Sequence, residues 1–379
     1  MKIESSKKLG DVLKEYKEKN TDNKYKPVAV GRYGIRKRED IYSKELAKDY
    51  SKNKLIYKDT LTVGMGSKQI DIGILTEDAI YAVSPAYHTF RINNIDANYL
   101  HYCLDARNAD MSERFMIASA RQGKSVDFKK MLEYEIPVYS ESDTQTILFN
   151  LSKIEEVILN LDNQLEKMDL LVKSRFIEMF GTLEKPKENY PQDCLENLCR
   201  KITDGKHGGC TRVEGSGRWF VGAREIYDDA VHYETAPEID VDEFAKDYRR
   251  CNIEKGDFLI VNTGATIGKS AIASDDRTEC TLLQKSVALL KVKTDILDPV
   301  FLKYCYAVNE RMYRIGDGSA QPNLLLSKIN KTEIYVPPLV KQNEFGMFVK
   351  EIDKSKLAVQ EMKNKMEILK ASVMQEYFC

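Results

Sequence analysis

The sequence predicts an α+β protein made of two similar globular units, each followed by a long helix. First, apolar residues recur at heptad spacing through residues 144–180 and again through residues 342–378, which is typical of long helices that pair with another helix. Second, three segments of the chain recur in the same order about 200 residues later, which indicates an internal duplication. Third, the strand-like runs are short and do not alternate regularly with helices, which favours an α+β fold over a doubly wound sheet.

The first helical stretch, residues 144–180, contains neither Pro nor Gly. At a rise of about 1.5 Å per residue it would form a rod of about 54 Å, long enough to act as a spacer. Its apolar seam consists of Ile147, Leu151, Ile154, Ile158, Leu161, Leu165, Met168, Val172, Phe176 and Met179. The second stretch is interrupted by Gly346 and weakened by Lys356, and its seam consists of Phe345, Val349, Ile352, Val359, Met362, Met366, Leu369 and Val373. The alternative interpretation is a pair of unrelated surface helices.

The duplication sets the domain boundaries. Three pairs of segments match, namely 58–66 with 256–264, 99–104 with 301–306, and 135–138 with 335–338. The last segment of each copy leads into one of the long helices. We therefore divide the chain into a first globular unit at 1–143, a first helix at 144–180, a second globular unit at 181–341 and a second helix at 342–379.

Within each globular unit we expect the same order of elements. The first unit has strand-like runs at 27–30, 55–63, 70–75 and 79–84, a helix near 97–115 and a final strand at 134–138. The second unit has strands at 219–222, 257–262, 270–273 and 287–292, a helix at 299–314 and a strand at 333–336. Asp298 can cap the latter helix, and Pro299 suits its first position.

The composition limits the partners that the chain can bind. With 58 basic and 59 acidic residues the net charge is -1, so nucleic acid or an acidic membrane must be met by local patches. The N-terminus is charged, and no run reaches the roughly 18 apolar residues of a membrane span. The eight cysteines include no Cys-x-x-Cys pair, and His207 and Cys210 alone do not make a zinc site. We expect a soluble, cytoplasmic protein without a metal or a membrane partner.

No catalytic constellation stands out in the sequence. Residues 260–270 look like a phosphate-binding loop, but Thr263 takes the place of its first glycine. A glycine-rich strand–turn–strand that lets the backbone approach a ligand is the better interpretation. No Gly-x-Ser-x-Gly elbow and no helical pair of metal-binding histidines occurs. We therefore predict no catalytic residue and no cofactor for this chain.

Basic patches are the remaining candidates for function. The second unit has a glycine-rich loop, Asp204-Gly-Lys-His-Gly-Gly-Cys-Thr-Arg212, and an arginine-flanked strand, Arg218-Trp-Phe-Val-Gly-Ala-Arg224. The first unit offers Arg32, Arg36, Lys37 and Arg38, and also Arg121-Gln-Gly-Lys-Ser125, whose place Gly318-Ser-Ala-Gln-Pro322 takes in the second unit. Arg and Lys can bind guanine and phosphates, and Gln can bind adenine. A single cation more often has a solvated surface role, so the sets are more persuasive than their members.

Several motifs together resemble one known family. Ile202-Thr-Asp-Gly-Lys-His207 and the strand ending at Arg224 are similar to the opening of that family's target-recognition domain. The segment from Lys255 to Lys269 is similar to its central part, and Gly318-Ser-Ala-Gln-Pro-Asn323, Ile334-Tyr-Val-Pro-Pro-Leu339 and Gln342 are similar to its close. With the tandem layout and two long helices, the whole chain resembles the specificity subunit of a type I restriction–modification enzyme. The first unit departs from the pattern, because it lacks the Asp-Gly-x-His loop.

The resemblance implies two target-recognition domains, each reading one half of a split target in double-stranded DNA. The two helices would pair as an antiparallel coiled coil, hold the domains apart and dock two methyltransferase subunits. Those subunits would bring S-adenosylmethionine and methylate adenine, and separate motor–nuclease restriction subunits would cut unmodified DNA. The chain itself would then be a non-catalytic subunit without a cofactor of its own.

The candidate residues follow from the patches and the resemblance. The expected DNA contacts are Arg32, Arg36, Lys68, Arg121, Gln122, Lys124, Lys206, His207, Arg212, Arg218, Arg224, Thr263, Thr266, Lys269, Ser319 and Gln321. The expected contacts with partner subunits are Leu151, Ile158, Leu165, Val172, Ile352, Val359, Met366 and Val373. Two alternatives stay open. One is a metal-dependent nuclease or methylation-enzyme fragment using Glu254, Asp257 and Lys269, and the other is a coiled-coil scaffold whose globular units bind proteins.

Overall fold

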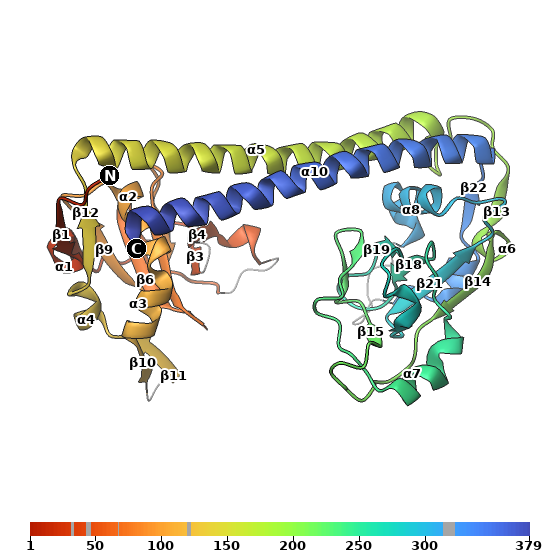
Figure 1. Ribbon diagram of the computed structural model, residues 1–379, viewed down its shortest axis with the longest axis horizontal. Helices are drawn as coiled ribbons and strands as arrows, with labels where there is room; N and C mark the ends of the chain where they lie inside the picture. Colours follow the sequence, from red (N-terminus) through yellow and green to blue (C-terminus); the bar gives the residue numbers. More distant parts are fainter. Residues whose placement is uncertain (32–33, 43–46, 67, 120–122, 314–322) are drawn as a thin grey trace. The chain divides into compact units, whose positions relative to one another are not determined.

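The structure is a computed structural model that describes residues 1–31, 34–42, 47–66, 68–119, 123–313 and 323–379. The chain divides into two compact units (Figure 1). Unit 1 comprises Met1–Asp162 and Glu361–Cys379, and unit 2 comprises Asn163–Gln360. Two helices of 40 residues, α5 (Glu141–Phe180) and α10 (Leu339–Phe378), contribute one end to each unit.

Unit 1 is built on a four-stranded antiparallel sheet. Its strands lie in the order β2 (Leu13–Tyr16), β9 (His88–Ile92), β6 (Thr60–Met65) and β7 (Ile70–Leu75). Helix α2 (Ala97–Ala106) shares the core with this sheet, and its Leu100 is fully buried in the same cluster as Leu61 and Phe90. The carboxylate of Asp96 caps α2 by accepting hydrogen bonds from the N–H groups of Asn98 and Tyr99 at 2.8 and 3.0 Å.

The other elements of unit 1 form strand pairs and short helices around this sheet. The antiparallel pairs are β1 (Ser5–Lys8) with β12 (Glu135–Val138), β3 (Val28–Gly31) with β4 (Gly34–Lys37), β5 (Lys54–Ile56) with β8 (Tyr81–Val83), and β10 (Met116–Ser119) with β11 (Gly123–Val126). The helices are α1 (Leu9–Val12), α3 (Asn108–Phe115), α4 (Phe128–Leu132) and the 3-10 turn η1 (Arg38–Asp40).

Unit 2 repeats this topology. Its four-stranded antiparallel sheet has the order β14 (Cys199–Asp204), β21 (Val287–Val292), β18 (Phe258–Val261) and β19 (Ser270–Ile272). Helix α8 (Pro299–Val308) follows the sheet as α2 does in unit 1, and the carboxylate of Asp298 caps it through the N–H groups of Val300 and Phe301. The common strand order and cap agree with the internal duplication.

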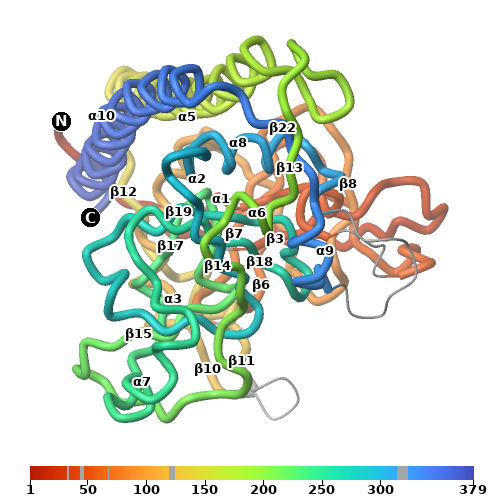
Figure 2. The backbone as a smooth tube through the Cα atoms, turned by 90° about the vertical axis from the view of Figure 1, so that its right-hand side faces the viewer, coloured from red at the N-terminus to blue at the C-terminus, as the bar shows by residue number. Residues whose placement is uncertain are grey.

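The remaining elements of unit 2 include one parallel pair, β15 (Trp219–Val221) with β20 (Thr281–Leu283). The antiparallel pairs are β13 (Gln192–Cys194) with β22 (Glu333–Tyr335) and β16 (Ile226–Tyr227) with β17 (Ala230–Val231). The helices are α6 (Leu195–Leu198), α7 (Val241–Asp247), α9 (Leu326–Asn330) and the 3-10 turns η2 (Tyr248–Arg250), η3 (Thr278–Cys280) and η4 (Glu310–Met312). Figure 2 shows α7 beside β15, and Phe244 of α7 packs with Phe220 of β15 and Leu282 of β20.

The ends of the long helices belong to the cores of the globular units. In unit 1, Ile147 and Leu151 of α5 and Phe378 of α10 are buried in the main core cluster. In unit 2, the rings of Phe176 and Phe345 lie 5.3 Å apart in a buried cluster. Each such side chain contributes about 1.5–3 kcal/mol of burial free energy. The helices are therefore fixed at their ends by apolar packing.

Ion pairs join the two helices within each unit. In unit 1, Lys363 contacts Asp162 at 2.6 Å and Lys370 contacts Glu155 at 2.7 Å. In unit 2, Lys356 pairs with Asp169. The lysines are seven residues apart in the sequence, and so are the acids, which run in the opposite direction. Lys356, which interrupts the apolar pattern of the second seam, has an acidic partner on α5.

Two further members of the expected second seam are in exposed positions. Met362 is 54% exposed and Leu369 is 45% exposed. Lys363 and Lys370, each one residue further along, face acids of α5 instead. The apolar pattern therefore placed the interface one residue too early at these two positions. Long lysine side chains can cover a helix interface with their methylene groups and still reach a carboxylate.

Three expected elements are divided or shortened in the structure. The strand at 55–63 is split into β5 and β6 at Asp59, which has a φ of 59°. The helix at 97–115 is broken at Arg107, whose Nε donates a hydrogen bond to the carbonyl of Phe378. The helix at 299–314 ends at Val308, because the Asn309 side chain bonds the Cys305 carbonyl at 2.6 Å and the Leu183 N–H at 2.8 Å. Tertiary contacts decide all three ends.

Among the described residues, no helix has the length and apolar character needed to cross a bilayer.

Candidate nucleic-acid interface

A short turn between β20 and β21 brings together three segments of unit 2 that are far apart in the sequence. We call Gln284, Lys285 and Ser286 the β20–β21 turn. Its backbone hydrogen bonds are Gln284 N–H to Val221 at 2.8 Å, Lys206 N–H to Leu283 at 2.7 Å, Lys285 N–H to Lys206 at 2.9 Å, and Asn262 N–H to Ser286 at 3.0 Å. The Asp-Gly-Lys-His loop, the arginine-flanked strand and the central glycine-rich segment thus meet at one place.

One glycine of these segments is required by close packing against backbone, and a second lies against the side chain of Gln284. A Cβ atom on Gly205 would lie 2.1 Å from the carbonyl oxygen of Leu283, a separation that no real Cβ tolerates. A Cβ atom on Gly222 would lie 2.9 Å from Oε1 of Gln284. The glycines of the Asp-Gly-Lys-His and Val-Gly-Ala-Arg motifs therefore allow the backbone to approach the β20–β21 turn.

Lys206 fixes its loop to helix α7. Its Nζ lies 2.6 Å from a carboxylate oxygen of Asp247 and 3.4 Å from one of Glu243, and only 18% of its side chain is exposed. The hydrogen bond with Asp247 is the main cause that raises the pKa of Lys206. Glu243 also accepts a hydrogen bond from the hydroxyl of Thr211 at 2.7 Å. The charge of Lys206 is therefore neutralised by two acids of α7, and this side chain holds its loop against that helix.

The other predicted cations of these segments differ in their exposure to solvent. Arg224 is exposed, and its side chain makes no hydrogen bond or ion pair within the described part of the chain. His207 is 64% exposed and lies 3.4 Å from Asp204. Arg212 is exposed as well. Arg218 is half-buried, with its guanidinium 5.1 Å from the centre of the Phe244 ring.

The glycine-rich segment forms the connection between β18 and β19. The Thr263 hydroxyl lies 3.3 Å from the side-chain oxygen of Asn323, and the Thr266 carbonyl accepts from the Lys269 N–H at 3.2 Å. Lys269 is exposed and lines a hollow of about 400 Å³ together with Asp228 and Asp229. Strand β19 follows this turn. The local structure is the strand–turn–strand that the sequence predicted.

The remaining predicted contacts fall into two groups. Arg36 on β4, Lys68 between β6 and β7, and Lys124 on β11 are exposed. Lys124 lines a hollow of about 490 Å³ in unit 1, together with Arg38 and His88. The other five residues lie outside the described part of the chain, namely Arg32, Arg121, Gln122, Ser319 and Gln321.

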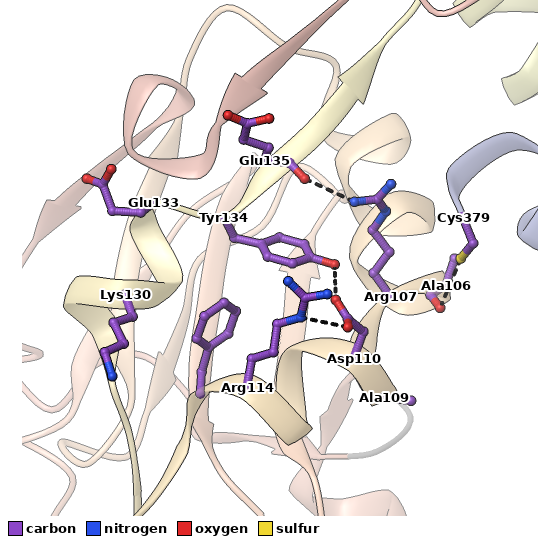
Figure 3. A pocket seen from close by; sticks show the side chains of 11 residues that line it. Ala106, Arg107, Ala109, Asp110, Arg114, Lys130, Glu133, Tyr134, Glu135 and Cys379 are labelled. Atoms are coloured by element: carbon purple, nitrogen blue, oxygen red, sulfur yellow. Dashed lines mark hydrogen bonds and ion pairs between the residues drawn. The ribbon is translucent and has the colours of Figure 1, made fainter.

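A further hollow in unit 1 is bordered by residues that hold neighbouring elements together. It has a volume of about 820 Å³ and lies beside Arg107, Arg114 and Tyr134 (Figure 3). Arg114 pairs with Asp110 at 2.7 Å, and the hydroxyl of Tyr134 donates to the same carboxylate at 2.6 Å. Arg107 donates to the carbonyl of Glu135 at 3.0 Å. Arg107 joins α2 to β12 and to the end of α10, and Tyr134 and Arg114 share the carboxylate of Asp110, so these contacts hold the elements of unit 1 together.

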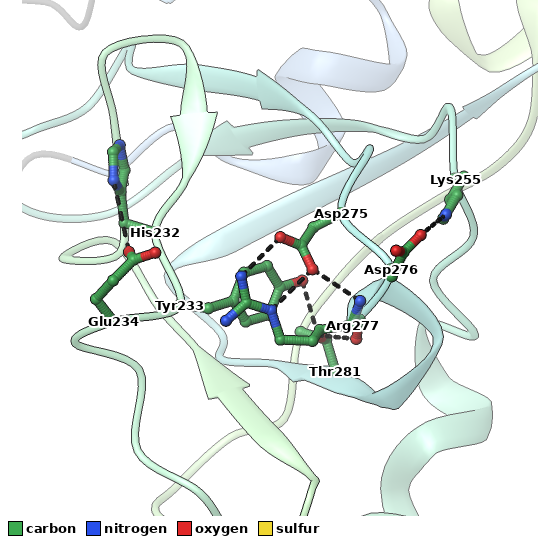
Figure 4. Close-up of polar contacts among 8 residues, drawn as sticks. All are labelled: His232, Tyr233, Glu234, Lys255, Asp275, Asp276, Arg277 and Thr281. Atoms are coloured by element: carbon green, nitrogen blue, oxygen red, sulfur yellow. Dashed lines mark hydrogen bonds and ion pairs between the residues drawn. The ribbon is translucent and has the colours of Figure 1, made fainter. Parts of the chain in front are cut away.

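A network in unit 2 holds the beginning of β20 (Figure 4). The guanidinium of Arg277 bonds both carboxylate oxygens of Asp275 at 2.8 Å and lies 4.4 Å from the centre of the Tyr233 ring. Arg277 holds the pKa of Asp275 at about 2. The hydroxyl of Thr281 bonds that of Tyr233 at 2.9 Å. Because β20 ends directly before Gln284, this network also fixes the β20–β21 turn.

The acidic residues considered for a metal-dependent nuclease are joined by a lysine. Nζ of Lys291 lies 2.7 Å from Asp257 and 3.0 Å from Glu254. Burial raises the pKa of Asp257, and the bond from Lys291 opposes this change. The ammonium group takes the place that a metal ion would need between the two carboxylates. Within the described residues, no group of three His, Cys, Asp or Glu side chains could hold a metal ion.

The residues expected to contact partner subunits are mostly covered. Leu151 and Val172 are fully buried in the unit cores, so they cannot form an external surface. Six others are partly buried, namely Ile158, Leu165, Ile352, Val359, Met366 and Val373. The exposed apolar residues of the two helices are different ones, including Leu159, Leu170, Leu357 and Ile368.

Sequence reasoning missed the residues of the β20–β21 turn. No motif marks Gln284, Lys285 or Ser286, and they were assigned neither to a strand nor to a patch. Their one sequence signal is their position directly before the strand at 287–292, which the duplication places opposite residues 84–86 of the first unit. The turn is recognised only through its backbone contacts with Lys206, Val221 and Asn262, which come from three earlier segments of the chain.

Comparison with known proteins agrees with these features. The family profile of the type I restriction modification DNA specificity domain matches residues 3–167 and 216–370. A solved structure described as "Structural basis underlying complex assembly and conformational transition of the type I R-M system" has a TM-score of 0.58 and 15% identity, and the match covers 100% of this chain and 98% of that one. The S subunit from M. genitalium has a TM-score of 0.48 and 15% identity, with coverages of 99% and 96%. The HsdS subunit from Thermoanaerobacter tengcongensis has a TM-score of 0.40 and 16% identity, with coverages of 99% and 96%.

The tandem domains and the matching profile define a DNA-sequence-recognition protein. The chain belongs to the family of type I restriction–modification specificity subunits.

Proposed function

We propose that the chain recognises a bipartite DNA target, with each unit reading one half. The observation that supports this most strongly is the repetition of one sheet order and one capped helix in both units. Two domains of the same design, with different residues at their edges, suit two different half-sites. The division at 1–143, 144–180, 181–341 and 342–379 is part of the proposal, and helix starts at Glu141 and Leu339 move two boundaries by three residues.

The two long helices act in this proposal as an antiparallel coiled coil that sets the distance between the half-sites. The heptad-spaced pairs of Lys356, Lys363 and Lys370 with acids of α5 support this pairing. Exposed ion pairs add little free energy, but their regular spacing favours one register. The length of the helices would then decide how many unspecified base pairs separate the two halves.

The catalytic steps belong to partner subunits in this proposal. Methyltransferase subunits, two per complex, would methylate adenine within the target, and restriction subunits would cut unmodified DNA. The pairing of Asp257 and Glu254 with Lys291 supports a non-catalytic role for this chain. Exposed apolar residues on α5 and α10, such as Leu159 and Ile368, are suited to partner contacts.

Methylome sequencing of cells with and without this chain tests the proposal. We expect a split motif containing adenine to be methylated only when the chain is present together with methyltransferase subunits. Arg224→Ala, which removes an exposed cation, should weaken methylation of that motif. Lys246→Ala on α7 also removes one basic residue and is the matched control. Methylation that is independent of the chain, or a motif that is continuous, would contradict the proposal.

A further inference from the structure

We propose that the β20–β21 turn is a base-reading element of unit 2, in which Gln284 contacts an adenine, Ser286 positions Gln284 and Lys285 contacts the adjacent phosphate. This inference rests on the proposed function, because it assumes that unit 2 reads one half-site. The turn lies where the three family motifs of the unit meet. None of its three residues belongs to those motifs.

The carboxamide of Gln284 is held in one orientation. The backbone N–H of Ala223 donates to the hydroxyl oxygen of Ser286 at 3.1 Å. The Ser286 hydroxyl in turn donates to Oε1 of Gln284. Because the hydroxyl accepts from the backbone, its proton is directed to the glutamine, and this chain of two bonds orients the amide.

The opposite side of the same amide is available for a ligand. Nε2 of the half-buried Gln284 has no hydrogen-bond partner in the portion of the chain that is described. One lone pair of Oε1 also remains, since an amide oxygen can accept two hydrogen bonds. Gly222 leaves room for Oε1 in this position, because a Cβ there would lie 2.9 Å from it. The packing therefore orients a donor and an acceptor side by side.

A donor and an acceptor on one planar group match the major-groove edge of adenine. Adenine offers the N7 acceptor and the N6 amino donor, and a glutamine side chain bonds both. Guanine presents two acceptors and would leave Oε1 without a partner. The adjacent Lys285 is exposed and forms no ion pair with the residues that are described, which suits a phosphate contact.

The rigidity of the surroundings explains why this turn can discriminate between bases. Its backbone is bonded to Val221, Lys206 and Asn262, and the Asp275–Arg277–Tyr233–Thr281 network holds the strand before it. A side chain fixed on several rigid segments loses less conformational entropy on binding than one on a free loop.

The test uses the full chain assembled with its methyltransferase subunits and DNA duplexes carrying the motif found by methylome sequencing. Each base pair of the unit 2 half-site is replaced in turn, and methylation rates and binding are measured. In the wild-type complex, one position of the half-site should show a preference for adenine over the other bases that depends on Gln284. In Gln284→Ala we expect the preference for adenine at that single position to fall roughly 5- to 150-fold, with the other positions unchanged.

Two further variants separate reading from positioning. Gln284→Glu should move the preference at the same position towards cytosine, because a carboxylate accepts from the cytosine amino group. Ser286→Ala should weaken the preference for adenine, and Ser286→Thr, which keeps the hydroxyl, should restore it. A merely structural Ser286 would instead affect all positions equally.

Lys285→Ala is the matched control for the phosphate contact. It should weaken binding to every sequence alike and reduce the slope of log K against log salt by about 0.9. The inference is overturned if folded Gln284→Ala complexes discriminate every position as the wild type does. If the wild-type complex has no split target at all, the proposed function fails as well, so that the two failures can be told apart.

Discussion

The two units share a four-stranded sheet followed by a capped helix, and they differ in the turn that leads into β9 in unit 1 and into β21 in unit 2. In unit 2 the turn after β20 contains Gln284, Lys285 and Ser286, and β20 pairs in parallel with β15. In unit 1 the corresponding turn after β8 begins Ser84-Pro-Ala-Tyr87, and β8 pairs antiparallel with β5 and forms a parallel bridge between Ala82 and Pro27. The sheets and the caps of the following helices are the same. The two copies therefore have the same sheet order and the same helix caps, and they differ in the turn that we propose as a DNA contact in unit 2.

The aromatic content of the unit 1 turn gives it another shape. Tyr87 donates a hydrogen bond to the carbonyl of Val30 at 2.8 Å. A Cβ on Gly64 would lie 2.1 Å from the Tyr87 ring, so that glycine makes room for it. The turn lines the hollow of about 490 Å³ that also contains Lys124. Unit 1 thus offers an aromatic hollow where unit 2 offers an oriented amide.

The largest effects are expected where the long helices enter the cores. Phe345→Ala in unit 2 and Phe378→Ala in unit 1 should each lower the free energy of unfolding by about 3–5 kcal/mol, because both rings are fully buried. Hydrogen exchange should show that each variant loosens chiefly its own unit. Phe149→Ala, at a 61% exposed position of α5, is the matched control and should change stability little. Equal effects of all three would contradict the account of the cores.

Gly205→Ala should affect unit 2 alone. The added Cβ would meet the backbone oxygen of Leu283 at 2.1 Å, which should cost about 1–3 kcal/mol. The variant should also weaken DNA binding, because the β20–β21 turn must move. Gly209→Ala in the same loop meets nothing within 4 Å and should be neutral in urea unfolding. If both variants behave alike, the close approach is not what requires the glycine.

The helix caps should give equal effects in the two units. Asp96→Ala and Asp298→Ala each remove a carboxylate that accepts two backbone N–H bonds, and each should cost about 1 kcal/mol. Asn replacements, which retain an acceptor oxygen, should recover most of the loss. A large difference between the two alanine variants in thermal unfolding would show that the helices are not equivalent.

The smallest effect is a pH dependence of stability that arises from one ion pair of unit 2. The pKa of Asp275 is lowered from 3.8 to about 2 by Arg277. Because the folded pKa is depressed, the stabilisation is fully present above the unfolded value and is lost as the pH falls through the folded value. Allowing for partial exposure, Asp275→Asn should cost about 1 kcal/mol at neutral pH and little near pH 2. Unfolding measured against pH for both proteins checks this, and a constant difference would contradict it.

Much of the fold could be predicted because its signals are local or repeated. Periodic apolar residues revealed α5 and α10, and the recurrence of the segments that contain Asp59 and Asp257 and of the Tyr-Cys segments revealed the duplicated units. The lysine–acid pairs also had a signal, since Lys356, Lys363 and Lys370 are spaced by seven as are Glu155, Asp162 and Asp169. This spacing was missed because only apolar residues were searched for at heptad positions.

The geometry of the candidate site depends on contacts that no sequence pattern shows. The anchoring of Lys206 to Glu243 and Asp247 joins residues about 40 positions apart. The β20–β21 turn becomes important only through a parallel strand pair between β15 and β20. Such parallel pairing of distant strands leaves no local periodicity, so the reading residue Gln284 could not be found from the sequence.

Exchange of residues 1–143 with those of a specificity subunit that has a different target tests the central claim most directly. The hybrid chain is expressed with the methyltransferase subunits, and the methylated motif is determined by methylome sequencing. The account predicts that one half of the motif changes, while the other half and the spacing stay as they are. A motif in which both halves change, or neither does, would contradict the account of two independent readers.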